Sequence, residues 1–469
     1  CLHYIYRDSR GTMWMGGTDG LLRYDNYNGI YDHVSWFRQN SPLTPLSHNR
    51  VRRVYEDVDG DIWVATDHGI NWYDRKSGQF HNFIILDKTG RYSTAWAYDI
   101  VLDSRKRLWI AAYMGGVFVI DKRRLLYSHG TVIADHHIAD GKGKLSNIHV
   151  GQLNVDAKGN IWDLVYGSGM ACINPVTFKV RTVMPQRNIS YMMADSHGRI
   201  WAGYDGGVTM INPYTGKTTD HKFTDGFTSD RVVSMVDAGG QIWALGGQTC
   251  RIINMNGSDR HFRIPGITAL TASYSPRDRM VYIGGNDGFV SVAPSVFSGK
   301  VNTHKLMLTS LLVNGHQYVN EKCDIRFADE VDLKYNENNL SFRLSDLPYD
   351  NSPQSIYLYK LEGSDNDWRY LDSRNGEIQY NALEYGNYRL LVKNIDNAAD
   401  DAFVYSLDVI ISPPWYLSIW AKIFYVILVI AILRWIMNFY AVKKNLKLER
   451  IARQRIMAQA QARTRFFAH

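Results

Sequence analysis

The sequence predicts a mainly β protein. The expected order is a seven-bladed β-propeller, an Ig-like β-sandwich, one transmembrane helix and a cytoplasmic linker helix. Three observations support this order: a Trp-containing motif recurs through residues 1–300, short alternating runs fill 301–412, and an apolar segment follows. The 469 residues include 38 Gly and 30 Tyr, a composition typical of short strands joined by tight turns.

The recurring motif is Asp-x-x-Gly-x-Ile/Leu-Trp, followed by small residues and a second Gly turn. In residues 57–70 it reads DVDGDIWVATDHGI, and in the third copy Lys106 replaces the Gly. Successive copies lie 39 to 53 residues apart, which is the period of a four-stranded propeller blade. We expect the aromatic side chain of each copy to pack in the core between neighbouring blades. These aromatic residues are Trp14, Trp63, Trp109, Trp162, Trp201, Trp243 and Tyr282.

Two sets of loops are predicted to share one face of the ring. Strand direction alternates within a blade, so the loop before each first strand and the turn after each Trp strand reach the same face. The loops span 46–50, 94–98, 145–149 and 228–231, and the turns contain Asp67, Tyr113, Tyr166, Tyr204, Gln248 and Asn286. Aromatic rings beside guanidinium groups suit sugars that carry an acidic group. The candidate ligand-binding residues are Arg50, Trp96, Tyr98, Tyr113, Tyr166, Tyr204 and Arg231, and the alternative for each is an ordinary loop residue.

No motif in the sequence indicates a catalytic residue, a metal ligand or a cofactor-binding residue. Residues 135–140 read DHHIAD, but adjacent His side chains usually diverge and no third ligand has a suitable spacing, so we favour a solvated loop. No Gly-x-Ser-x-Gly or phosphate-binding Gly loop is present. The four cysteines form no CxxC pair, which argues against a zinc knuckle or a disulfide framework. A hydrolase with paired carboxylates remains an open alternative.

Residues 303–412 alternate polar and apolar side chains, as the strands of a β-sandwich do. The runs span 306–312, 341–344, 355–361, 388–392 and 404–411. A transmembrane helix is predicted next, because residues 423–433 are eleven consecutive apolar residues with aromatic residues on both sides. Lys422 and Arg434 flank this run and can extend toward the membrane surfaces. A buried core helix is the alternative.

The net charge of +7 resides in residues 441–469, which contain eight Lys or Arg and one Glu. The remaining chain is neutral, which argues against a nucleic-acid-binding body. Positive charge flanks membrane helices on the cytoplasmic side, so we expect 441–469 to be cytoplasmic and 1–412 periplasmic. The basic segment lacks Gly and Pro and predicts a continuous helix, for which a coiled coil and a lipid- or nucleic-acid-binding helix are alternatives.

The order of these parts resembles the hybrid two-component sensor histidine kinases of Bacteroidetes. Residues 46–70 resemble their regulator-propeller unit, and YLYKLEGSDNDW at 357–368 resembles their three-tyrosine domain. SPPWYLSIWAKIFY at 412–425 resembles the entry to their membrane helix. The end, RTRFFAH, resembles the approach to a kinase H-box, whose phosphorylated His would follow His469.

This resemblance implies a dimeric inner-membrane sensor that binds a glycan-derived oligosaccharide in the periplasm and controls polysaccharide-use genes through a cytoplasmic phosphorelay. The expected domains are the propeller at 1–300, the three-tyrosine sandwich at 301–412, the membrane helix at 413–440 and a signalling helix at 441–469. ATP and Mg are expected for a kinase domain outside this chain, which leaves open whether the chain is itself an enzyme. The alternatives are a membrane-anchored propeller lyase or hydrolase, or the same sensor with another output domain.

Overall fold

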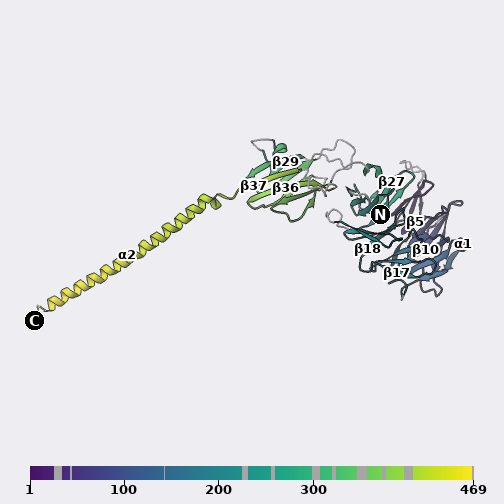
Figure 1. Cartoon of the computed structure of the whole chain (residues 1–469), viewed down its shortest axis with the longest axis horizontal. Coiled ribbons are helices and arrows are strands. Elements are labelled where there is room, and N and C mark those ends of the chain that lie inside the picture. The colour runs from purple at the N-terminus through teal and green to yellow at the C-terminus, as the bar shows by residue number, and fades with distance from the viewer. Residues whose placement is uncertain are drawn as a thin grey trace.

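The chain folds into a ring of small sheets, two facing sheets and one long helix in the computed structural model (Figure 1). The structure describes residues 1–25, 34–42, 45–141, 143–223, 231–254, 259–297, 307–319, 324–345, 356–371, 376–395 and 405–466. Several predictions fall outside these residues. They concern residues 228–230, Cys323 and His469, and the end residues Leu306, Ser355 and Val404 of three predicted runs.

The ring is built from antiparallel sheets whose strands follow chain order, and the described residues form seven of them. Sheet 1 contains β1 (Leu2–Arg7), β2 (Met13–Gly17), β3 (Leu21–Tyr24) and β4 (Val34–Phe37), and sheet 2 contains β5 (Val51–Glu56), β6 (Ile62–Thr66), β7 (Gly69–Asp74) and β8 (Gln79–Leu86). Sheet 3 contains β9 (Ala97–Leu102), β10 (Arg107–Ala112), β11 (Gly116–Asp121) and β13 (His136–Ile138). Between its last two strands, α1 (Lys122–Leu126) leads to β12 (Gly130–Ile133), which pairs in parallel with β8.

The second half of the ring continues the same topology. Sheet 4 contains β14 (Val150–Val155), β15 (Ile161–Val165), β16 (Met170–Ile173) and β17 (Val180–Val183), and sheet 5 contains β18 (Ile189–Ala194), β19 (Ile200–Tyr204), β20 (Gly207–Ile211) and β21 (Thr218–Lys222). Sheet 6 contains β22 (Ser234–Asp237), β23 (Ile242–Gly246), β24 (Thr249–Ile253) and β25 (Arg260–Arg263). Sheet 7 has three strands among the described residues: β26 (Ala269–Ser275), β27 (Met280–Gly285) and β28 (Gly288–Val292), followed by the 3-10 turn Pro294–Phe297.

Aromatic side chains join each sheet to the next and close the ring. Trp14 packs among the apolar residues of sheet 2, and Trp63 packs among those of sheet 3. The pattern repeats around the molecule until Tyr282 of sheet 7 packs against Ile5 and Met13 of sheet 1. All seven predicted aromatic residues are buried, which confirms their place in the core. The predicted propeller is confirmed, while seven blades stay a prediction for the protein as a whole.

A buried Asp fixes most of the Trp side chains. In the turn after β5, Oδ1 of Asp57 accepts hydrogen bonds from the backbone N–H groups of Asp59 and Asp61, at 2.9 and 3.1 Å. Oδ2 of Asp57 accepts the indole N–H of Trp63 at 2.9 Å. This Asp–indole bond recurs at 2.8 to 3.0 Å in sheets 1, 3, 4 and 5. Asp and Trp lie six residues apart in the motif. At this spacing one carboxylate accepts hydrogen bonds both from the turn backbone and from the buried indole.

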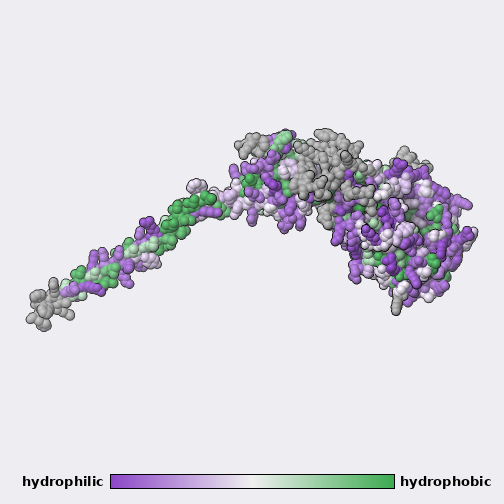
Figure 2. Space-filling view, viewed as in Figure 1, coloured by the Kyte–Doolittle hydropathy of each residue, from purple (hydrophilic) through white to green (hydrophobic). Residues whose placement is uncertain are grey.

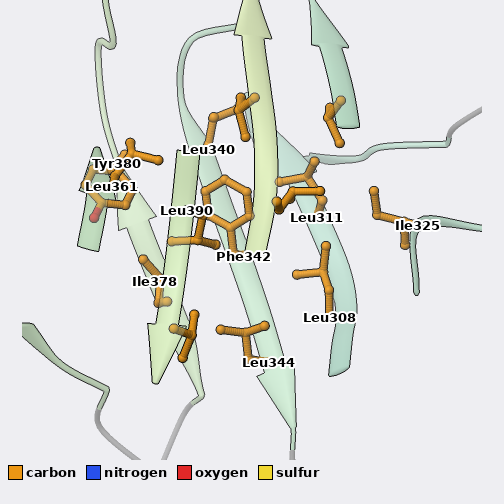
Figure 3. Close-up of a cluster of buried hydrophobic side chains, with 14 of the residues drawn as sticks. Leu308, Leu311, Ile325, Leu340, Phe342, Leu344, Leu361, Ile378, Tyr380 and Leu390 are labelled. Carbon is orange, nitrogen blue, oxygen red and sulfur yellow. The ribbon is translucent and has the colours of Figure 1, made fainter. Parts of the chain in front are cut away.

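The described residues between 307 and 411 form two facing sheets with a common core, which confirms the predicted β-sandwich (Figure 3). One sheet contains β29 (Met307–Val313), β30 (His316–Gln317), β32 (Leu340–Ser345) and β35 (Glu377–Tyr380). The other contains β31 (Glu330–Leu333), β33 (Tyr357–Glu362), β34 (Arg369–Tyr370), β36 (Gly386–Asn394) and β37 (Tyr405–Ile411), and a 3-10 turn spans Ile325–Phe327. Phe342, Leu361 and Leu390 meet in the core between the sheets (Figure 3). Tyr380 donates its hydroxyl proton to Asp365, which also accepts the backbone N–H of Leu361 at 2.9 Å.

A short 3-10 turn (Trp415–Leu417) leads into α2 (Ile419–Phe466), a helix of 48 residues. Its described side chains are largely exposed, and an apolar band covers the part nearest the sandwich (Figure 2). The helix is long and apolar enough to cross a membrane. The structure thus shows an isolated helix, and the alternative of a core helix buried in a globule is wrong.

Candidate functional site

Backbone hydrogen bonds tie the turns after the Trp strands to the loops that precede the first strands. In sheet 2 the N–H of Asp67 donates to the carbonyl of Arg50 at 3.2 Å. In sheet 3 the N–H of Tyr113 donates to the carbonyl of Trp96 at 2.8 Å, and in sheet 4 Tyr166 bonds His149 in the same way at 2.9 Å. Both sets of loops therefore lie at the same ends of their strands. This arrangement brings candidate residues from separate sheets toward one face of the ring.

Four of the candidate residues form an aromatic cluster across sheets 3 and 4. The rings of Tyr98 and Tyr113 stack with centroids 5.3 Å apart and an interplanar angle of 20°. Trp96 and Tyr166 each place a ring 6.0 Å from Tyr113, and Tyr166 meets it edge-on. Trp96 remains 47% exposed. The cluster thus combines a rigid stack with an aromatic face open to solvent.

Arginine side chains border this aromatic cluster. The guanidinium carbon of Arg52 lies 4.4 Å from the centroid of the Tyr98 ring. Arg52 also donates to both carboxylate oxygens of Asp67, at 2.6 and 3.0 Å. Arg50 lies farther from Asp67, at 3.7 Å, and its side chain is 45% exposed. Arg52 is therefore fixed between a ring and a carboxylate, whereas Arg50 contacts the same carboxylate less closely and is more exposed to solvent.

The pKa values of Tyr166 and His3 are shifted by burial and by the charges of nearby arginines. Burial, followed by the neighbouring Tyr98, raises the pKa of Tyr166 to about 12, and Arg231 and Arg52 oppose this shift. Arg231 therefore lies close enough to act on the aromatic cluster, and it is exposed. On the sheet 1 side, burial and then Arg52 and Arg50 lower the pKa of His3, which keeps that imidazole neutral near pH 7. We call Arg50, Arg52, Asp67, Trp96, Tyr98, Tyr113, Tyr166 and Arg231 the ring-face cluster.

The structure does not bring every candidate into this cluster. The ring of Tyr204 lies under the guanidinium group of Arg187, 4.6 Å from its carbon, and Arg187 pairs with Asp220 at 2.7 Å. Tyr204 also packs against the apolar cluster between sheets 4 and 5 that Tyr166 contacts, so it lies next to the ring-face cluster without joining its stack. Sequence reasoning also missed Arg52 and His149 as site residues. Arg52 follows Arg50 by two positions and so shares its side of the extended chain, a signal that could have identified it.

Two buried carboxyl groups lie beneath the cluster, between sheets 3 and 4. Asp99 accepts the backbone N–H of Leu153 at 3.0 Å and pairs with Arg53 at 3.1 Å. Burial raises the pKa of Asp163 well above its ordinary value, and the nearby Asp99 raises it further. Neither oxygen of the fully buried Asp163 has a hydrogen bond of normal geometry among the described residues. We therefore expect Asp163 to be protonated and uncharged at neutral pH.

The two adjacent histidines of the DHHIAD segment point to different neighbours. The ring of His136 stacks on Phe178, with centroids 4.1 Å apart. His137 packs against Phe118, and its Nε2 lies 2.7 Å from the carbonyl oxygen of Gly115. Within the described ranges no group of three His, Cys, Asp or Glu side chains could hold a metal ion. The predicted solvated loop is wrong for His136–Ile138, because these residues form β13 and pair with β11, and both histidines pack against aromatic rings.

A cavity of about 810 Å³ lies between sheets 1 and 7, apart from the ring-face cluster. Met15 and Leu22 of sheet 1 and Phe289 of sheet 7 supply apolar walls. Trp36 closes one side, with the guanidinium carbon of Arg38 lying 3.6 Å from its ring centroid. The seven candidate ligand-binding residues do not line this cavity, whereas Asn286 of the predicted shared face does.

Two family models match the chain. Residues 45–68 match the two component regulator propeller, and residues 348–412 match the Y_Y_Y domain. Both matches coincide with the segments that resemble these units in the sequence. The first match covers β5 and β6 of sheet 2, and the second covers the part of the sandwich that contains β33 to β37.

Similar proteins of known name or structure agree with these matches. The histidine kinase P4 of Formosa agariphila is 29% identical over 202 residues, which are 40% of this chain and 14% of that protein. The extracellular domain of the putative hybrid two component system BT4673 from B. thetaiotaomicron is 33% identical, with a TM-score of 0.59 over 88% of this chain and 57% of that one. The corresponding domain of BT3049 is 19% identical with a TM-score of 0.62, over 88% of this chain and 55% of that one, and shows the fold alone.

The chain thus spans just over half the length of the two Bacteroides domains and a small part of the kinase. The ring of sheets, the sandwich and the single apolar helix follow one another in the order expected for this kind of sensor. By its regulator-propeller and Y_Y_Y modules, the chain resembles the hybrid two-component sensor histidine kinases of Bacteroidetes.

Proposed function

We propose that this chain is the sensing and membrane-crossing part of a two-component histidine kinase, and that its ligand is a glycan-derived oligosaccharide. The ring-face cluster carries this proposal, because it joins an exposed aromatic ring to a fixed stack and to guanidinium groups. Aromatic faces pack against the C–H faces of sugar rings, and guanidinium groups bind hydroxyl or acidic oxygens. The residues proposed to contact the ligand are Arg50, Arg52, Trp96, Tyr98, Tyr113, Tyr166 and Arg231.

Ligand binding would act by favouring one arrangement of the sensor over another. In a homodimer, a ligand shifts that equilibrium only by its difference in affinity for the two arrangements. The sandwich lies between the ring and α2 along the chain, so it is placed to pass a displacement to the helix. A bias of about 1–3 kcal/mol would change output from several-fold to about a hundredfold. The kinase domain receiving this signal would use ATP and Mg.

The binding test uses the whole chain, residues 1–469, in lipid nanodiscs. Calorimetry is performed with a panel of oligosaccharides that differ in sugar, linkage and charge, and the solutions are then analysed for cleavage products. We expect binding of a subset without turnover. Tyr113→Ala and Trp96→Ala should each weaken binding about tenfold or more, the loss expected for a central aromatic contact.

Tyr214→Ala is the matched control for this binding test. Tyr214 is an exposed aromatic residue in the turn between β20 and β21, where a sheet reaches the opposite face of the ring. It should leave affinity unchanged. Equal losses in all three variants would argue against the ring-face cluster, and cleavage of any oligosaccharide would favour a propeller lyase or hydrolase.

A labelling experiment tests the membrane orientation. Val58 in sheet 2 and Gln461 near the end of α2 are exposed, and each is replaced by Cys in a Cys1→Ser background. In spheroplasts, a membrane-impermeant maleimide should label Val58→Cys at once and Gln461→Cys only after lysis. Labelling of both positions before lysis would overturn the proposed periplasmic sensor and inner-membrane crossing.

A further inference from the structure

The ring-face cluster carries an excess of positive charge. The guanidinium carbon of Arg52 lies 4.4 Å from the Tyr98 ring, Arg50 lies 3.7 Å from Asp67, and the charge of Arg231 acts on Tyr166. Asp67, whose side chain is 14% exposed, is the one carboxylate among these charges in the described part of the chain that is not fully buried, and it already binds Arg52 through both oxygens. Asp67 pairs with Arg50 and Arg52, so these charges comprise one such carboxylate and three guanidinium groups.

The other ionisable groups near the cluster do not reduce this excess. Asp163 is buried with a pKa raised well above its ordinary value, so it contributes no negative charge near pH 7. His3 is half-buried with a lowered pKa, so it contributes no positive charge. Asp99 beneath the cluster pairs with Arg53 at 3.1 Å, so this pair adds no net charge. The balance among Asp67, Arg50, Arg52 and Arg231 is then positive by two charges. A neutral sugar would leave that charge unmatched at a partly dry aromatic surface.

We infer that the ring-face cluster selects an anionic oligosaccharide, one that carries the carboxylate of a uronic acid or a sulfate ester beside the sugar ring on Trp96 and Tyr113. This inference rests on the proposed function and adds the charge class of its ligand. Arg52 is held by Asp67 and by the Tyr98 ring, so it positions the stack. Arg50 and Arg231 are exposed and supply the guanidinium groups for the acidic group.

The test compares three probes of equal length on the full chain in nanodiscs: an oligogalacturonate, a sulfated chondroitin oligosaccharide and a neutral galacto-oligosaccharide. We expect at least one acidic probe to bind about tenfold or more tightly than the neutral one. Its affinity should fall several-fold between 50 and 500 mM NaCl, whereas the affinity of a neutral sugar should not change. The two acidic probes distinguish a carboxylate from a sulfate as the preferred group.

Variants that change charge in opposite directions sharpen the test. Arg50→Gln and Arg231→Gln should each weaken the preferred acidic probe about tenfold, and Asp67→Asn should strengthen it several-fold, because it removes the competing carboxylate. Arg38→Gln is the matched control, since this exposed arginine pairs with Asp19 at 2.6 Å outside the cluster. A gain of affinity cannot come from misfolding, so Asp67→Asn remains informative if the arginine variants fold poorly.

The outcomes separate this inference from the proposed function. In one outcome the neutral probe binds as tightly as the acidic probes or more tightly, and Tyr113→Ala weakens that binding. This result would overturn the inference of an anionic ligand and leave the sensor proposal standing. Weaker binding of the acidic probe by Asp67→Asn would also overturn it. Absence of binding by every oligosaccharide in the panel would overturn both.

Discussion

Sheets 2 and 6 of the ring carry the same Asp-to-Trp spacing but hold the Trp in different ways. In sheet 2, Glu56 pairs with Ile62, and a five-residue turn between them places Asp57 under the indole of Trp63. In sheet 6, Asp237 itself pairs with Ile242, so the turn has four residues. Asp237 thus occupies the position that Glu56 has in sheet 2. Its carboxylate accepts the backbone N–H of Ser196 at 2.8 Å, away from the Trp.

Two consecutive glycines explain the shorter turn of sheet 6. Gly239 and Gly240 have φ values of 71° and 96°, and two positive φ values in succession give a tight hairpin turn. Ala238 then takes the buried position of the Asp, and the indole of Trp243 donates to Gln241 at 3.4 Å. Both Trp63 and Trp243 are fully buried. The comparison teaches that burial is sufficient to hold the Trp side chain in the core. Where the Asp carboxylate is present, it adds a hydrogen bond that joins the turn to the Trp.

The largest loss of stability is expected from substitution of Lys122. This residue stabilises the turn of sheet 2, and among the described residues sheet 6 has no equivalent. Its side chain is 8% exposed, and its ammonium group lies 2.6, 2.9 and 2.6 Å from Asp57, Asp59 and Asp61. Lys122→Met leaves three carboxylates together without their cation, so we expect a loss of about 3–5 kcal/mol in unfolding free energy. Urea denaturation monitored by Trp fluorescence measures it. Arg38→Gln, at an exposed pair, should cost about 0–1 kcal/mol.

The next largest difference in stability is expected between two Trp→Phe variants, which together distinguish the contribution of the Asp–indole bond from that of burial. Trp162→Phe and Trp243→Phe remove similar buried volume, but only the first removes a 2.8 Å bond to a buried carboxylate, that of Asp156. We expect Trp162→Phe to cost about 1–2 kcal/mol more than Trp243→Phe. Thermal and urea unfolding measure both losses of stability. If Trp162→Phe and Trp243→Phe lose equal stability, the Asp–indole bond contributes nothing, and burial of the Trp alone stabilises both sheets.

A smaller change in stability is expected at acidic pH, where Asp59 becomes protonated. Hydrogen bonds from Lys106 and Lys122 lower the pKa of Asp59 to about 2, below its unfolded value of about 3.9. A lowered folded pKa adds stability above the unfolded pKa, and this stability is lost as pH falls from about 4 toward 2. The Tm difference between the native chain and Lys122→Met should therefore narrow over this pH range. A difference that stays constant would contradict the role of Asp59, which is 44% exposed.

The smallest effect concerns Lys106, which replaces a turn glycine. Lys106 has a φ of 60°, while Gly159 at the same turn position of sheet 4 has 79°. Lys106→Gly should raise stability by roughly 0.5 kcal/mol, because relief of backbone strain exceeds the entropy cost of glycine. Gly159→Lys is the converse variant and should lower the Tm. A lower Tm for Lys106→Gly would mean that its exposed pair with Asp59, at 2.5 Å, outweighs the strain.

The aromatic core could be predicted closely, whereas the ring-face cluster could be predicted only in part. Trp14 and its six counterparts follow from a local motif whose residues lie within one hairpin. The stack of Tyr98 on Tyr113 was not foreseen as a contact, and loop position alone did not show that Tyr204 packs under Arg187 rather than on this stack. Sequence patterns order the residues within a sheet, but they do not give the distance between neighbouring sheets.

The amino-acid sequence by itself determined the repeating sheets, the buried aromatic residues, the sandwich and the apolar helix. Each of these depends on short-range periodicity and on burial of apolar surface, which a linear pattern records. Tertiary structure alone decided that Arg52 lies on the Tyr98 ring, that Arg231 acts on Tyr166, and that Ala238 replaces Asp in sheet 6. These contacts depend on how whole sheets pack around the ring and on the register of each turn, which no local pattern encodes.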